Sequence, residues 1–170
     1  MAERPSTPLR VGFLSTAQIG RKVSWAAKAA GVQLLAVASR DLDKAKAFAE
    51  AWGFERAYGS YDELISDPDI EAVYVPLPTG LHKQWVIAAA KARKHVLCDK
   101  PCALSLAELT EMTQACNEAG VQFMDNTMFM HNQRLVEMEV RLMLSTLWMM
   151  SLQRERGNPT TRSPSHPPRI

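Results

Sequence analysis

The 170-residue sequence has few of the features that mark specialised protein classes. Its three cysteines, Cys98, Cys102 and Cys116, are an odd number, which excludes a fully paired disulfide framework, and we expect reduced thiols that fill space near a strand end. The spacing of Cys98 and Cys102 comes without a second ligand pair, so no metal site is predicted. The longest apolar stretch, Leu142–Leu152, is far shorter than the roughly 20 residues that a membrane span needs.

No apolar segment lies in the first ten residues, and the sequence therefore predicts no secretory signal and a cytoplasmic location. The chain also has no large excess of positive or negative charge, since its net charge is only +2. Residues 151–170 contain four arginines and one glutamate, which leaves 16 basic and 17 acidic residues in the first 150. This balance excludes a basic surface for nucleic acid on the folded part of the chain.

What the chain does contain is a regular alternation of apolar strands and amphipathic helices. The order is typical of a doubly wound parallel α/β sheet of the Rossmann type, with helices on both faces. Two helices have a predicted buried stripe, one at Ile19, Val23, Ala26, Ala27 and Ala30 and one at Leu106, Leu109, Met112 and Cys116. We expect strands at 10–14, 33–38, 56–58, 72–75, 95–99 and 121–124, and helices at 19–30, 41–52, 60–64, 81–91 and 105–119.

Glycine is scarce at the turn after the first strand, where the sequence reads Val11-Gly12-Phe13-Leu14-Ser15-Thr16-Ala17-Gln18-Ile19-Gly20. Dinucleotide-binding folds place a Gly-x-Gly-x-x-Gly turn here, because small residues let backbone N–H groups approach a pyrophosphate at the helix N-terminus. In this chain the three small positions are Ser15, Ala17 and Gly20. A strand-turn-helix without a ligand gives the same pattern, so the turn alone leaves both interpretations open.

The second strand ends in Ser39-Arg40, about twenty residues further on, where such folds contact the adenosine ribose. NAD-binding sites favour a carboxylate here, whereas a hydroxyl followed by a guanidinium suits the 2′-phosphate of NADP. The alternative is a solvated arginine at a strand end. We predict NADP(H) rather than NAD(H) as the cofactor.

Two more loops follow strand ends, Pro76-Leu77-Pro78-Thr79-Gly80 and Asp99-Lys100-Pro101. The first is too rich in proline to be helical, so a helix is predicted to start only at Leu81. Because parallel strands bring their carboxyl ends to one edge of the sheet, all four loops should lie together there. That convergence is stronger evidence for a ligand site than any single motif.

With these motifs, residues 10–134 resemble the Gfo/Idh/MocA oxidoreductases, and especially plant members allied to dimeric dihydrodiol dehydrogenase and NADP-dependent D-xylose dehydrogenase. The resemblance is carried by residues 12–19, 37–40 and 73–82, by Asp99-Lys100-Pro101, and by residues 121–131. It implies hydride transfer between NADP and a sugar, polyol or dihydrodiol. Lys100 matches the catalytic lysine of a Glu-Lys-Pro motif, in which Asp99 replaces the glutamate and puts its ribose contact in doubt. The implied cofactor-binding residues are Ser15, Thr16, Ala17, Gln18, Ile19, Ser39, Arg40, Pro76, Pro78, Thr79, His82, Asp99, Lys100 and Pro101.

Outside this stretch the chain does not resemble the family. Residues 1–9 are expected to be a disordered leader, 135–153 an apolar helical extension, and 154–170 a disordered tail. The family's second α+β domain is expected to be missing, which suggests a truncated form with impaired catalysis. Alternatives are a non-catalytic NADP(H)-binding or interaction module, in which Leu142–Leu152 binds a full-length relative, and a poorly folded product without function.

Overall fold

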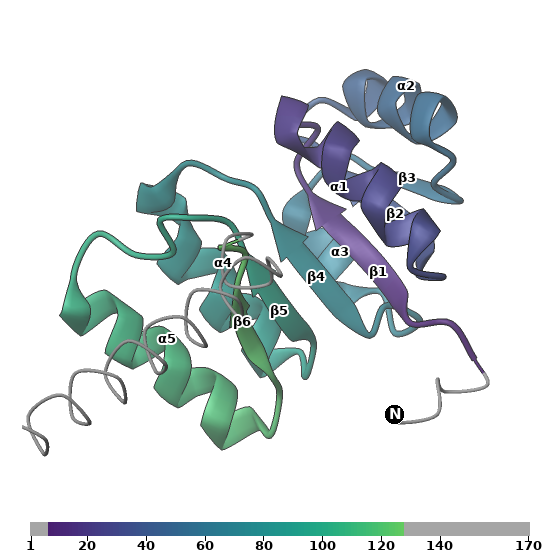
Figure 1. The fold of residues 1–170 in the computed structure, drawn as a ribbon. Helices are drawn as coiled ribbons and strands as arrows, with labels where there is room; N and C mark the ends of the chain where they lie inside the picture. Colours follow the sequence, from purple (N-terminus) through teal and green to yellow (C-terminus); the bar gives the residue numbers. More distant parts are fainter. Residues whose placement is uncertain (1–6, 128–170) are drawn as a thin grey trace, which may run out of the picture. The chain divides into compact units, whose positions relative to one another are not determined.

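The structure is a computed structural model, and it describes residues 7–127. The predicted leader and the two predicted segments after residue 134 therefore lie mostly or wholly outside the described residues. Strands and helices alternate along the described chain (Figure 1). Their order is β1 (Arg10–Leu14), α1 (Gln18–Ala29), β2 (Gln33–Ala38), α2 (Leu42–Trp52), β3 (Arg56–Tyr58), α3 (Tyr61–Ser66), β4 (Ala72–Val75), α4 (Thr79–Lys91), β5 (His95–Cys98), α5 (Leu106–Ala119) and β6 (Phe123–Asp125).

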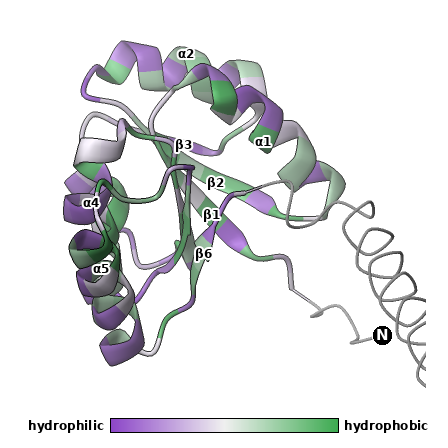
Figure 2. Ribbon diagram, turned by 60° about the vertical axis from the view of Figure 1, so that its left-hand side comes forward, coloured by the Kyte–Doolittle hydropathy of each residue, from purple (hydrophilic) through white to green (hydrophobic). Residues whose placement is uncertain are grey.

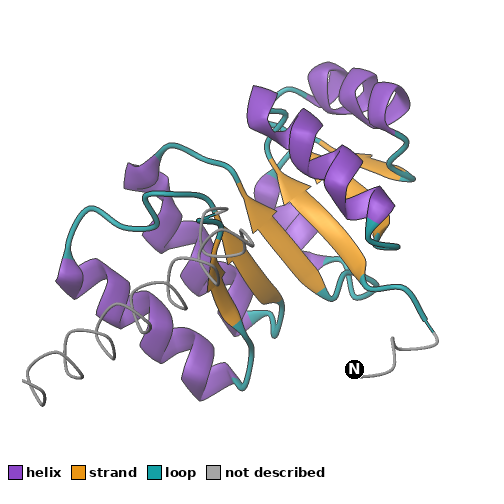
Figure 3. Ribbon diagram, viewed as in Figure 1, coloured by secondary structure: helices purple, strands orange, loops and turns teal. Residues whose placement is uncertain are grey.

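All six strands form one parallel sheet in the order β3-β2-β1-β4-β5-β6. The order runs outward from β1 on one side and from β4 on the other, so the direction of winding changes between these two strands. The strands point the same way, and the loops that follow them gather at one edge (Figure 3). The predicted doubly wound, Rossmann-type sheet is confirmed.

Two hydrophobic cores lie on opposite faces of the sheet. One core joins Phe13 of β1 and Tyr74 of β4 to residues of α1 and α2, including Phe48. The other joins strand residues such as Leu14 to α3, α4 and α5. The helices carry both hydrophobic and hydrophilic stretches, as expected for elements with one face on the sheet (Figure 2).

The buried face of α1 differs from the predicted stripe. Gly20 and Ser24 are its buried residues, whereas Ala26 and Ala30 are exposed. There is room for a small side chain only: a Cβ on Gly20 would already be in van der Waals contact with Phe48 at 3.4 Å and with Phe13 at 3.7 Å. The predicted stripe is right for Val23 and Ala27, which are partly buried and pack against the core, and wrong for Ala26 and Ala30. It missed Gly20 and Ser24 because it followed apolar character, whereas the contact with the sheet also favours small residues.

Several element boundaries also differ from the sequence-based ranges, and so does the burial of one residue of α5. The α4 helix begins at Thr79, directly after Pro78, because a proline fits ahead of the first turn of a helix. The Val121 N–H donates to Cys116 O and so belongs to the end of α5, which moves the start of β6 to Phe123. Leu106 is 80% exposed and not part of the buried stripe, because the first turn of α5 carries it away from the core formed by Met112 and Cys116.

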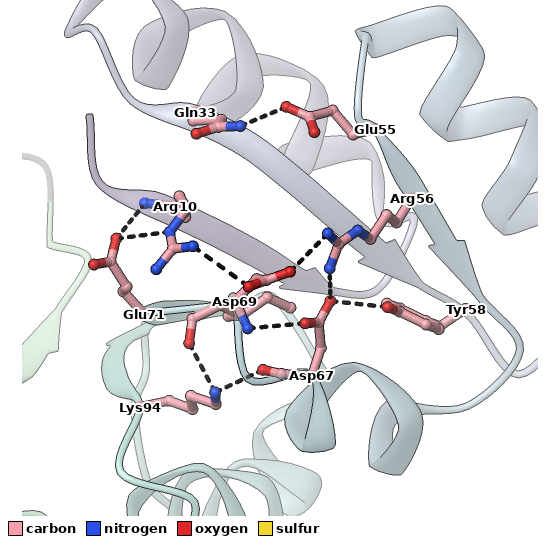
Figure 4. A network of polar contacts seen from close by, with 10 residues as sticks. Arg10, Gln33, Glu55, Arg56, Tyr58, Asp67, Asp69, Glu71 and Lys94 are labelled. Atoms are coloured by element: carbon pink, nitrogen blue, oxygen red, sulfur yellow. Dashed lines mark hydrogen bonds and ion pairs between the residues drawn. The ribbon is translucent and has the colours of Figure 1, made fainter. Parts of the chain in front are cut away.

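A polar network joins the amino ends of the strands, at the edge opposite the loops described above (Figure 4). The Arg56 guanidinium donates to Asp67 and Asp69 at 2.7 Å each, and the Tyr58 hydroxyl donates to Asp67 at 2.8 Å. Lys94 is buried, a position that lowers the pKa of its ammonium, and it donates to the carbonyl oxygens of Asp67 and Ile70 at 2.7 Å. The network ties the α3–β4 connection to β3 and to the start of β5.

We expect Asp67→Asn to destabilise the domain by about 1–2 kcal/mol at pH 7, since it weakens charge-assisted hydrogen bonds to the partly exposed Arg56. Burial alone would raise the pKa of the Asp67 carboxyl, but the donors Arg56, Asp69 N–H and Tyr58 outweigh it and lower that pKa. Because its pKa is lower in the folded state, the Asp67 carboxylate stabilises the folded domain at pH values above the unfolded-state pKa of about 3.9. This stabilisation is lost as the pH falls through the folded-state pKa.

Urea unfolding of both chains between pH 7 and pH 3 measures this effect. The difference between wild type and Asp67→Asn should shrink as the pH falls below about 4. The exposed Glu50→Gln on α2 is the control, with an expected change within about 0.5 kcal/mol at pH 7. A difference between wild type and Asp67→Asn that is independent of pH would contradict the assignment.

Candidate cofactor site

The change in winding direction between β1 and β4 is where open α/β sheets bind ligands. The two helices that start there, α1 and α4, have no side-chain cap at their N-termini. In contrast, α2, α3 and α5 are capped by Asp41, Ser60 and Ser105. The first N–H groups of α1 and α4 are therefore left without side-chain acceptors, and their dipoles favour an anion.

The β1–α1 turn has an unusual backbone at Ser15, whose φ is +149°. L-residues rarely adopt such values, and the dinucleotide-binding turn has its first glycine at this position. The Ser15 Oγ accepts a hydrogen bond from the Ala17 N–H at 3.0 Å. Because a hydroxyl accepts and donates at once, its O–H can still donate to a phosphate oxygen. Thr16 follows on the same turn, and Gln18 and Ile19 begin α1; all three are at least partly exposed.

The β2–α2 connection has a similar local arrangement. The Ser39 Oγ accepts from the Asp41 N–H at 3.2 Å, and the Asp41 carboxylate caps α2 through the N–H groups of Asp43 and Lys44. Arg40 is exposed. Burial raises the pKa of the Tyr61 hydroxyl, and the nearby charge of Arg40 opposes that rise. A hydroxyl and a guanidinium thus follow β2 at the same edge as Ser15.

The β4–α4 loop is partly buried. Pro76 is buried, Pro78 is exposed and Thr79 is half-buried as the first residue of α4. His82 is only 1% exposed, and both of its ring nitrogens face backbone carbonyl oxygens. The His82 ring therefore lies beneath the loop surface, not on it.

The β5–α5 loop presents Lys100 as an exposed ammonium between Asp99 and Pro101, across a cis Lys100–Pro101 peptide. The Asp99 Oδ1 accepts a hydrogen bond from the backbone N–H of the next residue, Lys100, at 3.1 Å, and another from the side-chain amide of Asn126 at 3.4 Å. The Tyr74 hydroxyl is buried nearby without a hydrogen bond of good geometry. Burial is the larger cause, and the negative charge of Asp99 the smaller one, of a raised pKa for this hydroxyl. The Asp99 carboxylate is thus held by the sheet side of the loop.

Asn126 and Tyr74 were not among the predicted site residues. Asn126 follows β6 and its N–H donates to Cys98 O at 2.8 Å, which places it at the same edge as Asp99. Its position after a strand end was the available signal. Tyr74 gave none, because a tyrosine inside an apolar strand resembles any core residue.

The three cysteines are free thiols and not candidates for nucleophilic chemistry. Burial raises the pKa of the Cys98 thiol to about 12, and burial also raises the pKa values of Cys102 and Cys116.

Among residues 7–127, no group of three metal-ligating side chains comes together. Over the same residues, no helix is long and apolar enough to cross a membrane.

The four predicted loops therefore come together at one edge of the sheet: residues 15–19 after β1, Ser39-Arg40 after β2, residues 76–82 after β4 and residues 99–101 after β5. Small residues, uncapped helix ends and two basic side chains lie on this edge. The arrangement fits an extended anion with several phosphate groups, such as a dinucleotide.

Comparisons with known proteins agree with this geometry. Residues 9–127 match a family model described as an oxidoreductase family with an NAD-binding Rossmann fold. The chain is 43% identical over 137 residues to D-xylose 1-dehydrogenase (NADP(+)) 2 of Haloferax volcanii, a match that covers 80% of this chain and 42% of the relative. It is 43% identical over 93 residues to bovine trans-1,2-dihydrobenzene-1,2-diol dehydrogenase, which covers 55% of this chain and 28% of the relative.

Among solved structures, a 3-ketoreductase from Actinomadura kijaniata in complex with NADP and TDP-benzene superimposes with a TM-score of 0.75 at 36% identity. The superposition covers 82% of this chain and 43% of the ketoreductase. This chain thus spans less than half the length of the relatives that it matches.

Proposed function

Because the chain belongs to the Gfo/Idh/MocA family of oxidoreductases, we propose that its Rossmann domain binds NADP(H) at the carboxyl edge of the sheet. There it would present Lys100 to the reacting hydroxyl of a sugar, polyol or dihydrodiol. The observation that carries the proposal is the convergence of four loops at the change in winding direction, next to two helices without side-chain caps.

The pyrophosphate would lie against the start of α1. Gly20 is buried where α1 packs on the sheet, and the Ser15 hydroxyl can donate to a phosphate oxygen while its lone pair accepts from Ala17 N–H. The N–H groups of Gln18 and Ile19 in the uncapped first turn supply further donors. The residues present here fit the group that they would hold.

The 2′-phosphate would contact Ser39 and Arg40. The end of β2 carries no carboxylate to accept hydrogen bonds from two ribose hydroxyls, and Asp41 is occupied as the cap of α2. The exposed Arg40 offers a planar set of donors that suits a phosphate. This chemistry favours NADP over NAD as the cofactor.

Lys100 would act on the substrate oxygen. NADPH, when bound, supplies the hydride, and the Lys100 ammonium would donate a hydrogen bond to the carbonyl oxygen that becomes negatively charged as the hydride adds. Asp99 Oδ1 already accepts from the Lys100 N–H and the Asn126 side chain, so a contact with the ribose would have to use Oδ2. The contacts of Asp99 Oδ1 also fix the backbone from which Lys100 extends.

A second candidate is NADP(H) binding without catalysis. Of the described residues, only Lys100 is assigned a contact with the substrate, whereas all the other proposed contacts serve the cofactor. In this case Leu142–Leu152, outside the described residues, would bind a full-length relative. Both candidates include a cytoplasmic location.

Oxidation of D-xylose and of trans-dihydrobenzenediol with NADP⁺, followed at 340 nm alongside NADPH binding, distinguishes the two candidates. We expect Lys100→Met to bind NADPH within a few-fold of wild type and to lose about 100-fold or more in kcat. The control is Lys91→Met in the last turn of α4, which should keep the activity. Binding without turnover in the wild type would support the second candidate, and no binding of NADPH or NADH would contradict both.

A further inference from the structure

His82 has a contact pattern that direct binding of a cofactor does not explain. Its Nε2 lies 2.6 Å from Leu77 O and its Nδ1 lies 3.1 Å from Cys102 O, while the residue is only 1% exposed. Both edges of the ring that can hydrogen-bond are therefore occupied by backbone. No ring nitrogen is left to contact a ligand.

The two carbonyl groups belong to different loops of the candidate site. Leu77 lies in the β4–α4 loop between Pro76 and Pro78, whereas Cys102 follows Lys100-Pro101 in the β5–α5 loop. The His82 ring is thus the bridge between the loop that borders the cofactor and the loop that carries Lys100. Cys98 supports the second loop from the same side, because its thiol lies 3.8 Å from Cys102 O.

The chemistry of imidazole makes this bridge specific. A neutral ring has one N–H and donates to one of the two carbonyl oxygens, whereas a ring that carries both protons donates to both. An apolar side chain of similar size would leave two buried carbonyl oxygens without this donor. The ring is rigid and leaves α4 in its first turn, so the spacing of the two loops follows from the position of the helix.

We propose that His82 is a positioning residue that holds the Lys100 loop at a fixed distance from the Pro76–Pro78 loop, and so sets the position of Lys100 against bound NADP(H). The inference rests on the proposed function. It differs from the role that the family resemblance implies for His82, because the side chain acts through backbone carbonyls and does not touch the cofactor.

Three substitutions and one control test the bridge. His82→Leu removes both ring contacts, His82→Gln keeps a donor near the Nε2 position, and His82→Asn keeps one near the Nδ1 position. Val86→Ala is the matched control, because Val86 is a fully buried residue one turn further along the same helix and is four residues from His82. The full chain is used throughout, with NADPH as the probe.

Two readouts separate positioning from general stability. The first is the Kd for NADPH, measured by fluorescence well below each variant's Tm. The second is the amide resonance of Lys100 in 1H–15N spectra of the chain without cofactor. We expect His82→Leu to raise the Kd about tenfold and to shift the Lys100 amide, with a smaller effect for His82→Gln or His82→Asn. Val86→Ala should lower the Tm but leave the Kd within twofold and the Lys100 amide in place.

Equal Kd values and an unchanged Lys100 amide in His82→Leu would overturn the inference and leave the proposed function intact. If His82→Leu does not fold, the same comparison is made with His82→Gln and His82→Asn, and wild-type behaviour of both would overturn it equally. If the wild type binds neither NADPH nor NADH, the proposed function fails, and the Lys100 amide alone decides whether His82 holds the loop.

Discussion

Replacing Phe13 by alanine is expected to destabilise the domain by about 3–5 kcal/mol and to lower its Tm by roughly 10–20 °C. Phe13 is the fourth of the five residues of β1 and is 1% exposed. Its ring makes edge-to-face contacts with Phe54 at 5.0 Å and with Tyr74 at 4.9 Å between centroids. Gly20 of α1 lies against the same ring, so α1, β4 and the α2–β3 connection would line the resulting cavity.

The large effect is expected because this cavity cannot collapse easily. The rings of Phe54 and Tyr74 are fixed by their own strands and loops, and α1 already lies close to the sheet. Thermal unfolding by circular dichroism measures the change. Trp25→Ala, which removes a 72% exposed aromatic side chain from α1, is the control and should change stability by about 0.5 kcal/mol or less. A loss below about 1 kcal/mol for Phe13→Ala would contradict the packing described here.

Arg40→Asp should weaken NADPH binding about 100-fold and change NADH binding only a few-fold. The substitution removes charge-assisted hydrogen bonds to the 2′-phosphate, each contributing about 1.5–3 kcal/mol, and adds a negative charge beside that phosphate. The new carboxylate can accept hydrogen bonds from the ribose hydroxyls of NADH, which lack the phosphate. Isothermal titration with both cofactors measures the two affinities.

Arg93→Asp is the matched control for this change in charge. Arg93 is exposed in the α4–β5 connection, at the amino edge of the sheet, and its φ of +58° is a value that aspartate tolerates. It should leave both cofactor affinities within about twofold of wild type, because the site is remote and salt screens the charge. Equal losses of NADPH and NADH in Arg40→Asp would mean that Arg40 does not contact the 2′-phosphate.

The architecture could be predicted because it is specified by short-range patterns. Continuous apolar strands such as Ala72–Val75, capping residues such as Ser60 and Ser105, and glycines after helix ends each define a local structure independently. The errors occurred where tertiary contacts decide. At α1 the contact with the sheet buries the small residues Gly20 and Ser24, and at α5 the helix starts beyond the core and exposes Leu106.

The site was predictable to the extent that chain topology places it. Four loops after four parallel strands had to meet at one edge, whichever side chains they carried. The side-chain partnerships within that edge were not accessible from the sequence. Neither the two carbonyl contacts of His82 nor the approach of Asn126 to Asp99 follows from spacing, since each joins residues of different loops.

Mapping of NADPH binding by 1H–15N spectra of the chain tests the central claim most directly. We predict that saturating NADPH shifts the amides of residues 15–20, Ser39-Arg40 and Asp99-Lys100, which follow β1, β2 and β5 at the carboxyl edge. The amides around Asp67 and Lys94, at the opposite edge, should not move. Shifts confined to the Asp67–Lys94 edge, or no shifts at a concentration of NADPH that saturates its relatives, would contradict a cofactor site at the carboxyl edge of this sheet.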